Sequence, residues 1–420
     1  MKVRKTFWVI IGLLVIFLAA GRQFQYQLLN KVVYVLLVLI LISWIWTRFS
    51  LTGIQFSRKA RSLRKETGQV FEERLRLENK SAFFKSWIEI IDHSKLPGQN
   101  GSRIMAWVGR GELRHYSSYT LLTHRGKFLL SPTEIKSGDP FGLFEKTVTL
   151  ESNQSLLVLP IQFKIHNFSL PPGYLPGGKS IRRRTAAITP HAAGIREYLP
   201  GDSMNRIHWK KTAQRGMLIT KEFEEDPQSD IWIILDSHVL SHSKTMQDAP
   251  IPKADRFWSI KEKSTYQLPM DSYEYAVSTV ATIADYFIRI GQGVGFRDIG
   301  KNSLILPPEK GYRQLEKIME SLAFIAADGE QSMETGVLSH MSQIFPGSLV
   351  ILIGTDRSTG LERSAESLKL RKIHPVFILM DSDSFTGEKR TVSSNAALLK
   401  QMGVIATTIH YKDSIADHLE

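Results

Sequence analysis

The residues with the most evident chemical potential follow an apolar run, Ile231–Leu235, in the second half of the chain. The group combines a carboxylate, two hydroxyls and two imidazoles, and it consists of Asp236, Ser237, His238, Ser241 and His242. Serine, histidine and aspartate form the catalytic triad of many hydrolases, and two histidines can supply part of the ligand set of a zinc site. No third histidine with ligand spacing accompanies them, and the sequence lacks a Gly-x-Ser-x-Gly motif. We therefore interpret the group as a polar loop, and a hydrolase that uses it is the alternative function.

Composition excludes other classes of chemistry. The chain has no cysteine, which rules out disulfides, thiolate metal ligands and cysteine nucleophiles. Its formal net charge of +13 would suit a nucleic-acid binder, but residues 1–65 hold 11 of the 54 basic residues and none of the 41 acidic ones. Because the excess positive charge coincides with the hydrophobic runs, we predict a membrane bilayer as partner and no nucleic acid.

Residues 194–236 connect the two halves of the chain and are expected to hold one compact helix followed by strands. Asp202 is placed to cap a helix over about residues 203–214, and Gly216 is placed to end it. The side of this helix that we expect to be buried consists of Ile207, Trp209 and Ala213.

Seven residues of this stretch have a distinctive spacing: Tyr198, Gly201, Asp202, Arg206, Trp209, Ala213 and Arg215. The pattern resembles the signature of the bacterial domain-of-unknown-function 58 family, and Arg125-Gly126 and Asp139–Phe144 match that family too. We interpret the Asp139–Phe144 hexapeptide as a turn with core packing, and a binding loop is the alternative. The resemblance implies two membrane helices, a β-rich domain, the signature and a von Willebrand factor A-like domain.

Many von Willebrand A domains hold Mg²⁺ through an Asp-x-Ser-x-Ser motif after the first strand. The corresponding residues here are Asp236, His238 and Leu240. Leucine cannot bind a metal, and a neutral imidazole is a poor ligand for so hard a cation. The two further ligands that the resemblance implies are Thr335, which matches only approximately, and Asp356. We therefore expect a degenerate site, formed by Asp236, Thr335 and Asp356, that binds no metal, and we expect no cofactor.

The signature helix carries the residues that we expect to bind a partner. In a structural role, Asp202 caps the helix, Trp209 packs on the sheet and Arg206 pairs with a nearby acid. In a functional role, Arg206 faces outward with Lys210 and Lys211 and docks an acidic surface. The pattern favours the structural role for Asp202 and Trp209 and leaves both roles open for Arg206.

The resemblance also implies partners, namely a MoxR-type AAA+ ATPase and, in some bacteria, a transglutaminase-like membrane protein. Because no complete catalytic set is visible, we predict a non-enzymatic protein-interaction or assembly factor.

Residues 1–50 contain two apolar runs, Phe7–Ala20 and Val32–Trp46. Each is shorter than the roughly 20 residues that span a bilayer, and the first could be a signal peptide, but their close spacing favours a membrane hairpin. Three basic residues precede the runs, two separate them and six follow them. By the positive-inside rule, both termini and the soluble domains of this multi-pass plasma-membrane protein face the cytoplasm. Residues that suit interfacial anchoring are Trp8, Tyr34, Trp44 and Trp46.

Residues 66–165 are predicted to form an all-β sandwich, and a small barrel is the rival fold. Turn residues separate short segments of strand-like composition. These segments are 74–78, 87–91, 104–108, 113–123, 126–131, 146–151 and 156–159.

The second half begins with a linker over residues 166–193, which is rich in proline and glycine. It contains Arg182–Arg184, which could touch anionic lipid or an acidic partner, although a solvated linker is the preferred interpretation. The signature segment is assigned to residues 194–229.

Residues 230–420 alternate between strands and helices, which predicts an α/β fold with a mostly parallel sheet. This agrees with the von Willebrand A-like domain that the resemblance implies. The expected strands are 231–236, 293–299, 302–306, 348–354, 375–380 and 403–409. The expected helices are 272–290, 310–326, 333–344, 361–371 and 392–402.

Overall fold

The computed structural model describes residues 1–24, 27–96, 101–170, 192–199, 204–223, 230–244, 266–387 and 394–420. The chain divides into two compact units. The first comprises Met1–Leu159 with Pro250–Tyr266, and the second comprises Pro160–Ala249 with Gln267–Glu420. Arg182–Arg184 and most of the expected linker lie outside the described residues.

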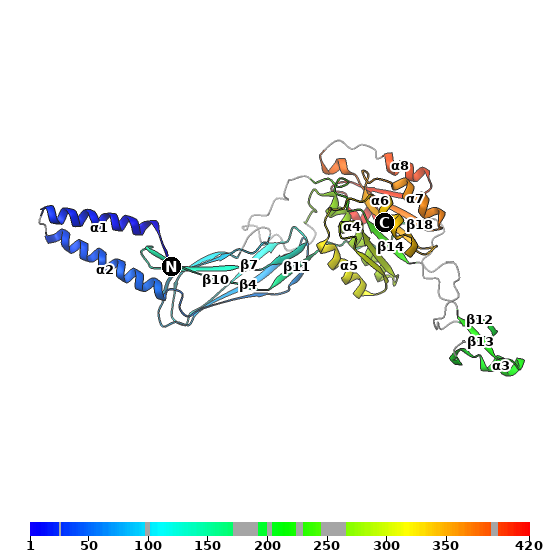
Figure 1. Cartoon of the computed structure of the whole chain (residues 1–420), viewed down its shortest axis with the longest axis horizontal. Helices are drawn as coiled ribbons and strands as arrows, with labels where there is room; N and C mark the ends of the chain where they lie inside the picture. Colours follow the sequence, from blue (N-terminus) through cyan, green and yellow to red (C-terminus); the bar gives the residue numbers. More distant parts are fainter. Residues whose placement is uncertain are drawn as a thin grey trace. The chain divides into compact units, whose positions relative to one another are not determined.

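Helix α1 (Lys5–Phe24) and helix α2 (Gln27–Phe49) lie side by side in the first unit (Figure 1). They have 20 and 23 residues, so at 1.5 Å per residue they are about 30 and 35 Å long, similar to the hydrocarbon core of a bilayer. Few of their residues are buried. The two helices that the apolar runs predicted are therefore long and apolar enough to cross a membrane.

Both ends of this helical hairpin join the same end of the sheet-rich region. Before α1, strand β1 (Lys2–Val3) pairs antiparallel with β10 (Phe144–Leu150). The backbone N–H of Arg4 then donates to the carbonyl of Leu143 at 3.0 Å. After α2, a short turn leads directly into β2 (Ile54–Ala60).

One five-stranded sheet and two three-stranded sheets make up the rest of the first unit, and the two larger sheets are the five-stranded one and β2-β4-β7, whose strands are the longer. The strand orders are β1-β10-β9-β5-β6, β2-β4-β7 and β3-β11-β8. The remaining strands are β3 (Arg64–Glu66), β4 (Val70–Asn79), β5 (Lys85–Asp92), β6 (Arg103–Val108), β7 (Leu113–Leu121), β8 (Gly126–Leu129), β9 (Thr133–Gly138) and β11 (Ser155–Leu159).

The two larger sheets share one apolar core. Leu77 on β4 packs in the same buried cluster as Ile88 and Ile90 on β5, and Phe56 from β2 packs against it. Buried and exposed positions alternate along these strands, as expected when one face of a sheet packs on a core. The predicted sheet-rich region is therefore confirmed, with two packed layers.

The sheet-rich region differs from the prediction at two places. After the helical hairpin, the region begins at Ile54 and not at residue 66. Strand β2 was not predicted because Arg58 occupies an inward position and so breaks the apolar alternation. Strand β9 was not predicted, because Ile135 is its only large apolar residue.

The second unit is built on a six-stranded sheet in the order β16-β15-β14-β17-β18-β19. Neighbouring strands are parallel, except that β16 is antiparallel to β15. The strands are β14 (Ile231–Leu235), β15 (Val294–Asp298), β16 (Ile305–Glu309), β17 (Leu349–Thr355), β18 (His374–Met380) and β19 (Ile405–Ile409). Strands β14 and β17 are buried throughout, which explains their unbroken apolar runs.

Helices cover both faces of this sheet (Figure 1). Helix α4 contacts β14, β15, β17 and β18 and packs with α5 and α9. On the other face, α6, α7 and α8 share a core with Trp232, Val350 and Phe377. The helices are α4 (Ser272–Arg289), α5 (Tyr312–Phe324), α6 (Met333–His340), α7 (Leu361–Leu370), α8 (Ser394–Gln401) and α9 (Ile415–Leu419). Short 3-10 helices lie at Met204–Arg206, Met341–Gln343 and Ser382–Phe385.

The predicted α/β region with a mostly parallel sheet is confirmed. The predicted hairpin is also present, but its second strand lies at Ile305–Glu309 and not at residues 302–306.

Candidate functional site

The winding direction of the second unit's sheet reverses between β14 and β17. From β14 the chain winds through β15 to β16 on one side, and from β17 it winds through β18 to β19 on the other. Ligands of open α/β sheets bind where the winding direction reverses, outside the carboxyl ends of the strands. Asp236 and the polar residues that follow it lie at this point, which we call the carboxyl edge.

Asp236 joins the two central strands across the reversal point. Its side chain is buried, and its carboxylate accepts the backbone N–H of His238 at 2.9 Å and the hydroxyl of Ser358. Ser358 lies in the turn after β17 and is 122 positions away in the chain. Ser358 was not predicted, because no local pattern in the sequence connects it to Asp236.

Asp298 lies next to Asp236 along this edge, at the end of β15. Its carboxylate accepts the hydroxyl of Ser237, which also lies 2.8 Å from the hydroxyl of Tyr273. Burial raises the pKa of Asp298 to about 6, and the charge of Asp328 adds to this, whereas the Ser237 hydrogen bond acts against it. Asp298 is therefore a buried carboxyl group that titrates close to neutral pH.

The two histidines of the polar group have structural partners. His242 Nε2 lies 2.7 Å from the backbone carbonyl oxygen of Asp236, so Nε2 carries the proton and donates. His242 Nδ1 lies 3.3 Å from the hydroxyl of Ser272. Desolvation lowers the pKa of His242, which keeps the ring neutral. His238 Nδ1 accepts the backbone N–H of Leu240 at 3.2 Å.

A second histidine–aspartate pair lies at the ends of β18 and β19. His410 Nδ1 is 2.6 Å from Asp381 Oδ2, and Asp381 is fully buried. The other carboxylate oxygen, Oδ1, has no hydrogen-bond partner within the part of the chain that the structure describes. The sequence did not indicate this pair, because its members come from different strands.

Each of the three residues of the expected degenerate metal site has a hydrogen-bond partner outside the set. Asp236 accepts from Ser358, and Asp356 accepts the backbone N–H of Ser382 at 2.9 Å. Thr335 lies on α6, where its hydroxyl is 2.9 Å from that of Ser332. Over the described ranges, no group of three or more His, Cys, Asp or Glu side chains is arranged to hold a metal ion.

The signature segment, described for residues 192–199 and 204–223, is a β-hairpin with a helix in its connection. Strand β12 (Ala192–Glu197) pairs antiparallel with β13 (Ile219–Phe223), and α3 (Trp209–Arg215) lies between them in the chain. The backbone N–H of His208 donates to the carbonyl of Ile219 at 2.7 Å, which ties the start of α3 to β13.

The signature helix begins later than predicted. Residues Met204–Arg206 form a 3-10 turn, and α3 starts only at Trp209. The residue that caps α3 is His208, whose side chain accepts a backbone N–H of the first turn. Asp202, the predicted cap, lies outside the described residues. Gly216 ends α3 with a φ of 67°, the left-handed conformation that favours glycine, as predicted.

The predicted buried side of this helix is wrong. Trp209 is 65% exposed and Ala213 is exposed as well, whereas Ile207 is buried. The reason is local: Ile207 precedes α3 and forms a β-bridge with Thr220, so the helical spacing that would place it beside Trp209 does not apply.

The candidate partner-binding residues are therefore placed as follows. Lys210 and Lys211 are exposed on the first turn of α3, next to Trp209. Arg206 ends the 3-10 turn, and its side chain is not among those described. Other exposed large apolar residues of the segment are Ile195, Leu199, Met204, Met217 and Leu218.

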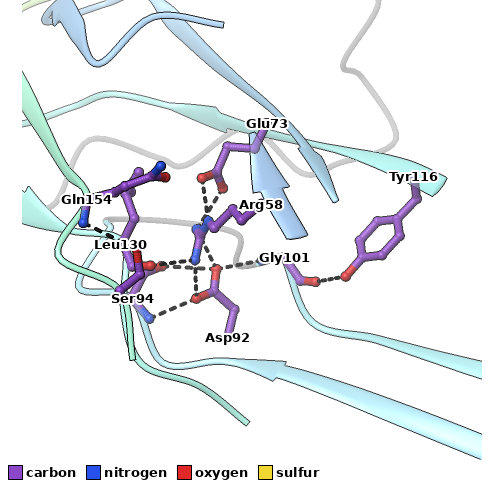
Figure 2. Close-up of polar contacts among 9 residues, drawn as sticks. Arg58, Glu73, Asp92, Ser94, Gly101, Tyr116, Leu130 and Gln154 are labelled. Atoms are coloured by element: carbon purple, nitrogen blue, oxygen red, sulfur yellow. Dashed lines mark hydrogen bonds and ion pairs between the residues drawn. The ribbon is translucent and has the colours of Figure 1, made fainter. Parts of the chain in front are cut away.

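A buried ionic cluster in the first unit also escaped the sequence analysis (Figure 2). Arg58 on β2 donates to both carboxylate oxygens of Glu73 at 2.6 and 2.7 Å and to both of Asp92 at 3.0 Å. Its remaining N–H bond goes to the carbonyl of Leu130 at 3.0 Å, so all five donors of the guanidinium are used. Glu73 lies on β4 and Asp92 ends β5, so the cluster links the two larger sheets.

One known protein is similar to this chain over most of its length. Uncharacterized protein YeaD of Bacillus subtilis (strain 168) is 22% identical over 414 residues, covering 88% of this chain and 95% of the relative.

Two similar solved structures each cover less than half of this chain. The CARDB domain of a Pyrococcus furiosus protein matches with a TM-score of 0.19 and 9% identity, covering 25% of this chain and 91% of that domain. Proximal thread matrix protein 1 from the mussel byssus matches with a TM-score of 0.28 and 14% identity, covering 46% of each chain. Neither match supports a conclusion about fold or function.

A family model matches the signature segment and most of the six-stranded sheet of the second unit. Residues 194–371 match the model of the protein of unknown function DUF58. The match begins within β12 and ends directly after α7, so it includes α3, Asp236, Asp298 and Ser358. The chain thus carries a DUF58 family domain at residues 194–371.

Proposed function

We propose that this chain is a membrane-anchored, non-enzymatic protein-interaction or assembly factor whose signature segment docks an acidic partner. The proposal rests on the exposure of Trp209: 65% of its surface is accessible, and it lies next to Lys210 and Lys211. Large aromatic side chains dominate the binding energy of protein interfaces, and positive charge attracts an acidic surface.

The backbone of the segment supports this role. Pairing of β12 with β13 and the bond from His208 to Ile219 fix α3 on the hairpin before any partner binds. A binding element that is already ordered loses less conformational entropy on association. Over residues 194–229 six basic residues stand against six acidic ones, so the positive charge that supports docking is local to Lys210 and Lys211 on the first turn of α3.

The resemblance to the DUF58 family makes a MoxR-type AAA+ ATPase the first candidate partner and a transglutaminase-like membrane protein the second. We infer also that the second unit is a von Willebrand A-like domain that works without a metal. The reversal of winding between β14 and β17 supports the A-like fold, and Leu240, which offers no ligand atom, supports the loss of the metal.

The arrangement of the carboxyl edge argues against the hydrolase alternative. Ser237 is fully buried and its hydroxyl is bonded to Asp298 and Tyr273. His242 uses Nε2 to donate to a backbone carbonyl, so this nitrogen is not free to accept a proton from a nucleophile.

We infer further that α1 and α2 form a multi-pass anchor in the plasma membrane, with both termini and the soluble domains in the cytoplasm. The pairing of β1 with β10 supports a topology in which the start of the chain and the sheet-rich region lie on the same side of the membrane. It also argues against a cleaved signal peptide, because cleavage after Gly21 would remove β1 from the sheet. The excess of basic residues outside the hairpin supports the cytoplasmic side.

The proposal is tested by titrating the full chain in mild detergent with a purified MoxR-type ATPase from the same organism. Reversing two charges with Lys210→Glu and Lys211→Glu is expected to weaken binding by about tenfold or more, equivalent to about 1.4 kcal/mol. The matched control is Lys400→Glu, an exposed lysine on α8, which should bind like the wild type. Equal binding by all three proteins would contradict docking through the signature segment, and no binding by the wild type would exclude this ATPase as the partner.

A further inference from the structure

Three turns of the sheet-rich region lie at the end where the helical hairpin joins it. Strand β2 leaves the hairpin at Ile54, which pairs with Asn79 at the end of β4. Lys85, which opens β5, pairs with Val108, which closes β6. Phe144, which opens β10, pairs with Val3, directly before α1. The antiparallel register therefore brings turns 80–84, 109–112 and 139–143 to the hairpin end.

Each of these turns carries or adjoins an exposed aromatic side chain. Phe83 is 67% exposed in the first turn, Trp107 is 67% exposed beside the second, and Phe141 is 56% exposed in the third. Trp107 has a φ of 54°, a left-handed conformation that is strained for a bulky residue. The fold thus holds a large aromatic side chain in solvent at the cost of backbone strain, which core packing does not explain.

The aromatic residues continue the apolar surface of the hairpin. The ring of Trp46, on α2, lies 5.1 Å from that of Phe84, which stacks on Trp107 at 5.7 Å. On the α1 side, Phe7 lies 5.2 Å from Phe144, and the hydroxyl of Thr6 donates to the carbonyl of Gly142. Between α2 and the first turn is a pocket of about 370 Å³, lined mainly by apolar side chains.

Basic residues accompany these turns. Lys80 lies in the first turn and Arg110 in the second, and both are exposed. Lys5 opens α1 and Arg48 lies in the last turn of α2. This combination of aromatic rings and positive charge at the level of a membrane helix end is typical of the bilayer interface.

The opposite end of the sheet-rich region is different. Its turns lie near residues 61–63, 93–102, 122–125, 130–132 and 151–154. Where the structure describes them, these turns contain no exposed phenylalanine, tryptophan or tyrosine.

We propose that turns 80–84, 109–112 and 139–143, with Trp107, form an interfacial collar that embeds in the boundary between lipid headgroups and acyl chains. The inference rests on the proposed membrane anchoring of α1 and α2. The collar would hold the sheet-rich region against the bilayer surface around the hairpin, and it gives the Asp139–Phe144 hexapeptide a role in binding lipid.

The lack of cysteine allows this to be tested with single labels in the full chain. We would introduce Phe83→Cys, Trp107→Cys and Phe141→Cys separately, attach an environment-sensitive fluorophore, and reconstitute each protein into phosphatidylcholine–phosphatidylglycerol vesicles. Leu37→Cys, in the middle of α2, reports the membrane core, and Asn153→Cys, exposed at the opposite end, reports water.

The collar labels are expected to be quenched by nitroxides placed near the lipid headgroup and protected from aqueous iodide. Labels at 83, 107 and 141 that iodide quenches as strongly as the label at 153, while the label at 37 stays protected, would overturn the collar and leave the anchor intact. Iodide access to the label at 37 as well would overturn both the collar and the membrane anchoring on which it rests.

Discussion

Both units of this chain bury carboxylates, but the two units stabilise them in opposite ways. In the first unit, Glu73 and Asp92 share the guanidinium of Arg58, and all three side chains are at most 7% exposed. In the second unit, Asp236 and Asp298 are equally buried at the carboxyl edge. There the bonds come from hydroxyls and backbone N–H groups, and neither carboxylate forms an ion pair with Lys or Arg among the described residues.

The shifts in pKa follow this difference. Burial by itself would raise the pKa of Asp92, but hydrogen bonds from Arg58 and its positive charge outweigh burial and lower that pKa. At Asp298 only hydrogen bonds from Ser237 and the backbone of Gly300 oppose burial, no positive charge helps them, and the pKa rises to about 6. In the first unit, Glu73 and Asp92 are therefore both neutralised by Arg58. In the second unit, no Lys or Arg among the described residues neutralises Asp236 or Asp298, and these carboxyl groups lie where α/β sheets bind ligands. We interpret the first cluster as a link between two sheets and the second as the part of the sheet suited to binding.

The largest expected effect is on the link between the sheets. Arg58→Met removes the only cation of the cluster and leaves two buried carboxylates unpaired, which should destabilise the first unit by about 3–5 kcal/mol. Chemical unfolding in detergent measures this change. The matched control is Arg74→Met, because Arg74 lies on β4, is 79% exposed and makes only a 3.7 Å contact with Glu72. If Arg58→Met lowered the free energy of unfolding as little as Arg74→Met does, the cluster would not hold the sheets together.

The next effect concerns the carboxyl edge. Because the pKa of Asp298 is raised to about 6 in the folded state, from about 3.9 when unfolded, the folded state binds an extra proton between these values. Stability of the second unit should thus fall as pH rises from about 4 to 6 and then remain at the lower level. Asp298→Asn keeps an acceptor for Ser237 without the charge. It should be more stable than the wild type by about 2–3 kcal/mol at pH 7.5 and similar to it at pH 4.

Thermal unfolding at the two pH values checks this prediction. The control is Glu366→Gln on α7, which removes an exposed carboxylate of the same unit and should change little at either pH. A lower melting temperature of Asp298→Asn at pH 7.5 would mean that the charged carboxylate is stabilised in the fold, contrary to the comparison.

The smallest expected effect is that of divalent ions. Because Leu240 offers no ligand and Thr335 bonds to Ser332, we predict the same melting temperature of the second unit with EDTA as with Mg²⁺ or Mn²⁺. A specific site should stabilise the fold by about 2.7 kcal/mol when the free ion reaches 100 times its Kd. A clear rise would show that the second unit binds a divalent cation and would contradict the expected loss of the metal site formed by Asp236, Thr335 and Asp356.

Much of the second unit was predictable because its signals are local. Continuous apolar runs such as Ile231–Leu235 indicated buried parallel strands, and Asp236 lies directly after that run at the carboxyl edge. The bonds at that edge were not predictable. Ser358 reaches Asp236 over 122 positions, and His410 reaches Asp381 over 29, so only the folded sheet brings them together.

The first unit and the signature segment show two other limits. Strand β2 was missed because a buried arginine stands where an apolar residue was expected, and its partners Glu73 and Asp92 lie 15 and 34 positions away. Trp209 was expected to be buried because the helix was assumed to include Ile207. The β-bridge of Ile207 to Thr220 removes that residue from the helix and leaves Trp209 exposed.

The most direct test of the proposed function is a paired measurement on Trp209→Ala in the full chain, giving its melting temperature and its Kd for the MoxR-type ATPase. Because Trp209 is 65% exposed, its removal should change stability by no more than about 0.5 kcal/mol. As an interface anchor, it should cost about 2 kcal/mol or more in binding, roughly a thirtyfold rise in Kd. Tyr312→Ala, at a tyrosine that is 67% exposed on α5, is the matched control and should leave both quantities unchanged. A Kd for Trp209→Ala equal to that of the control, or a melting temperature that falls steeply, would contradict a docking role for the signature segment.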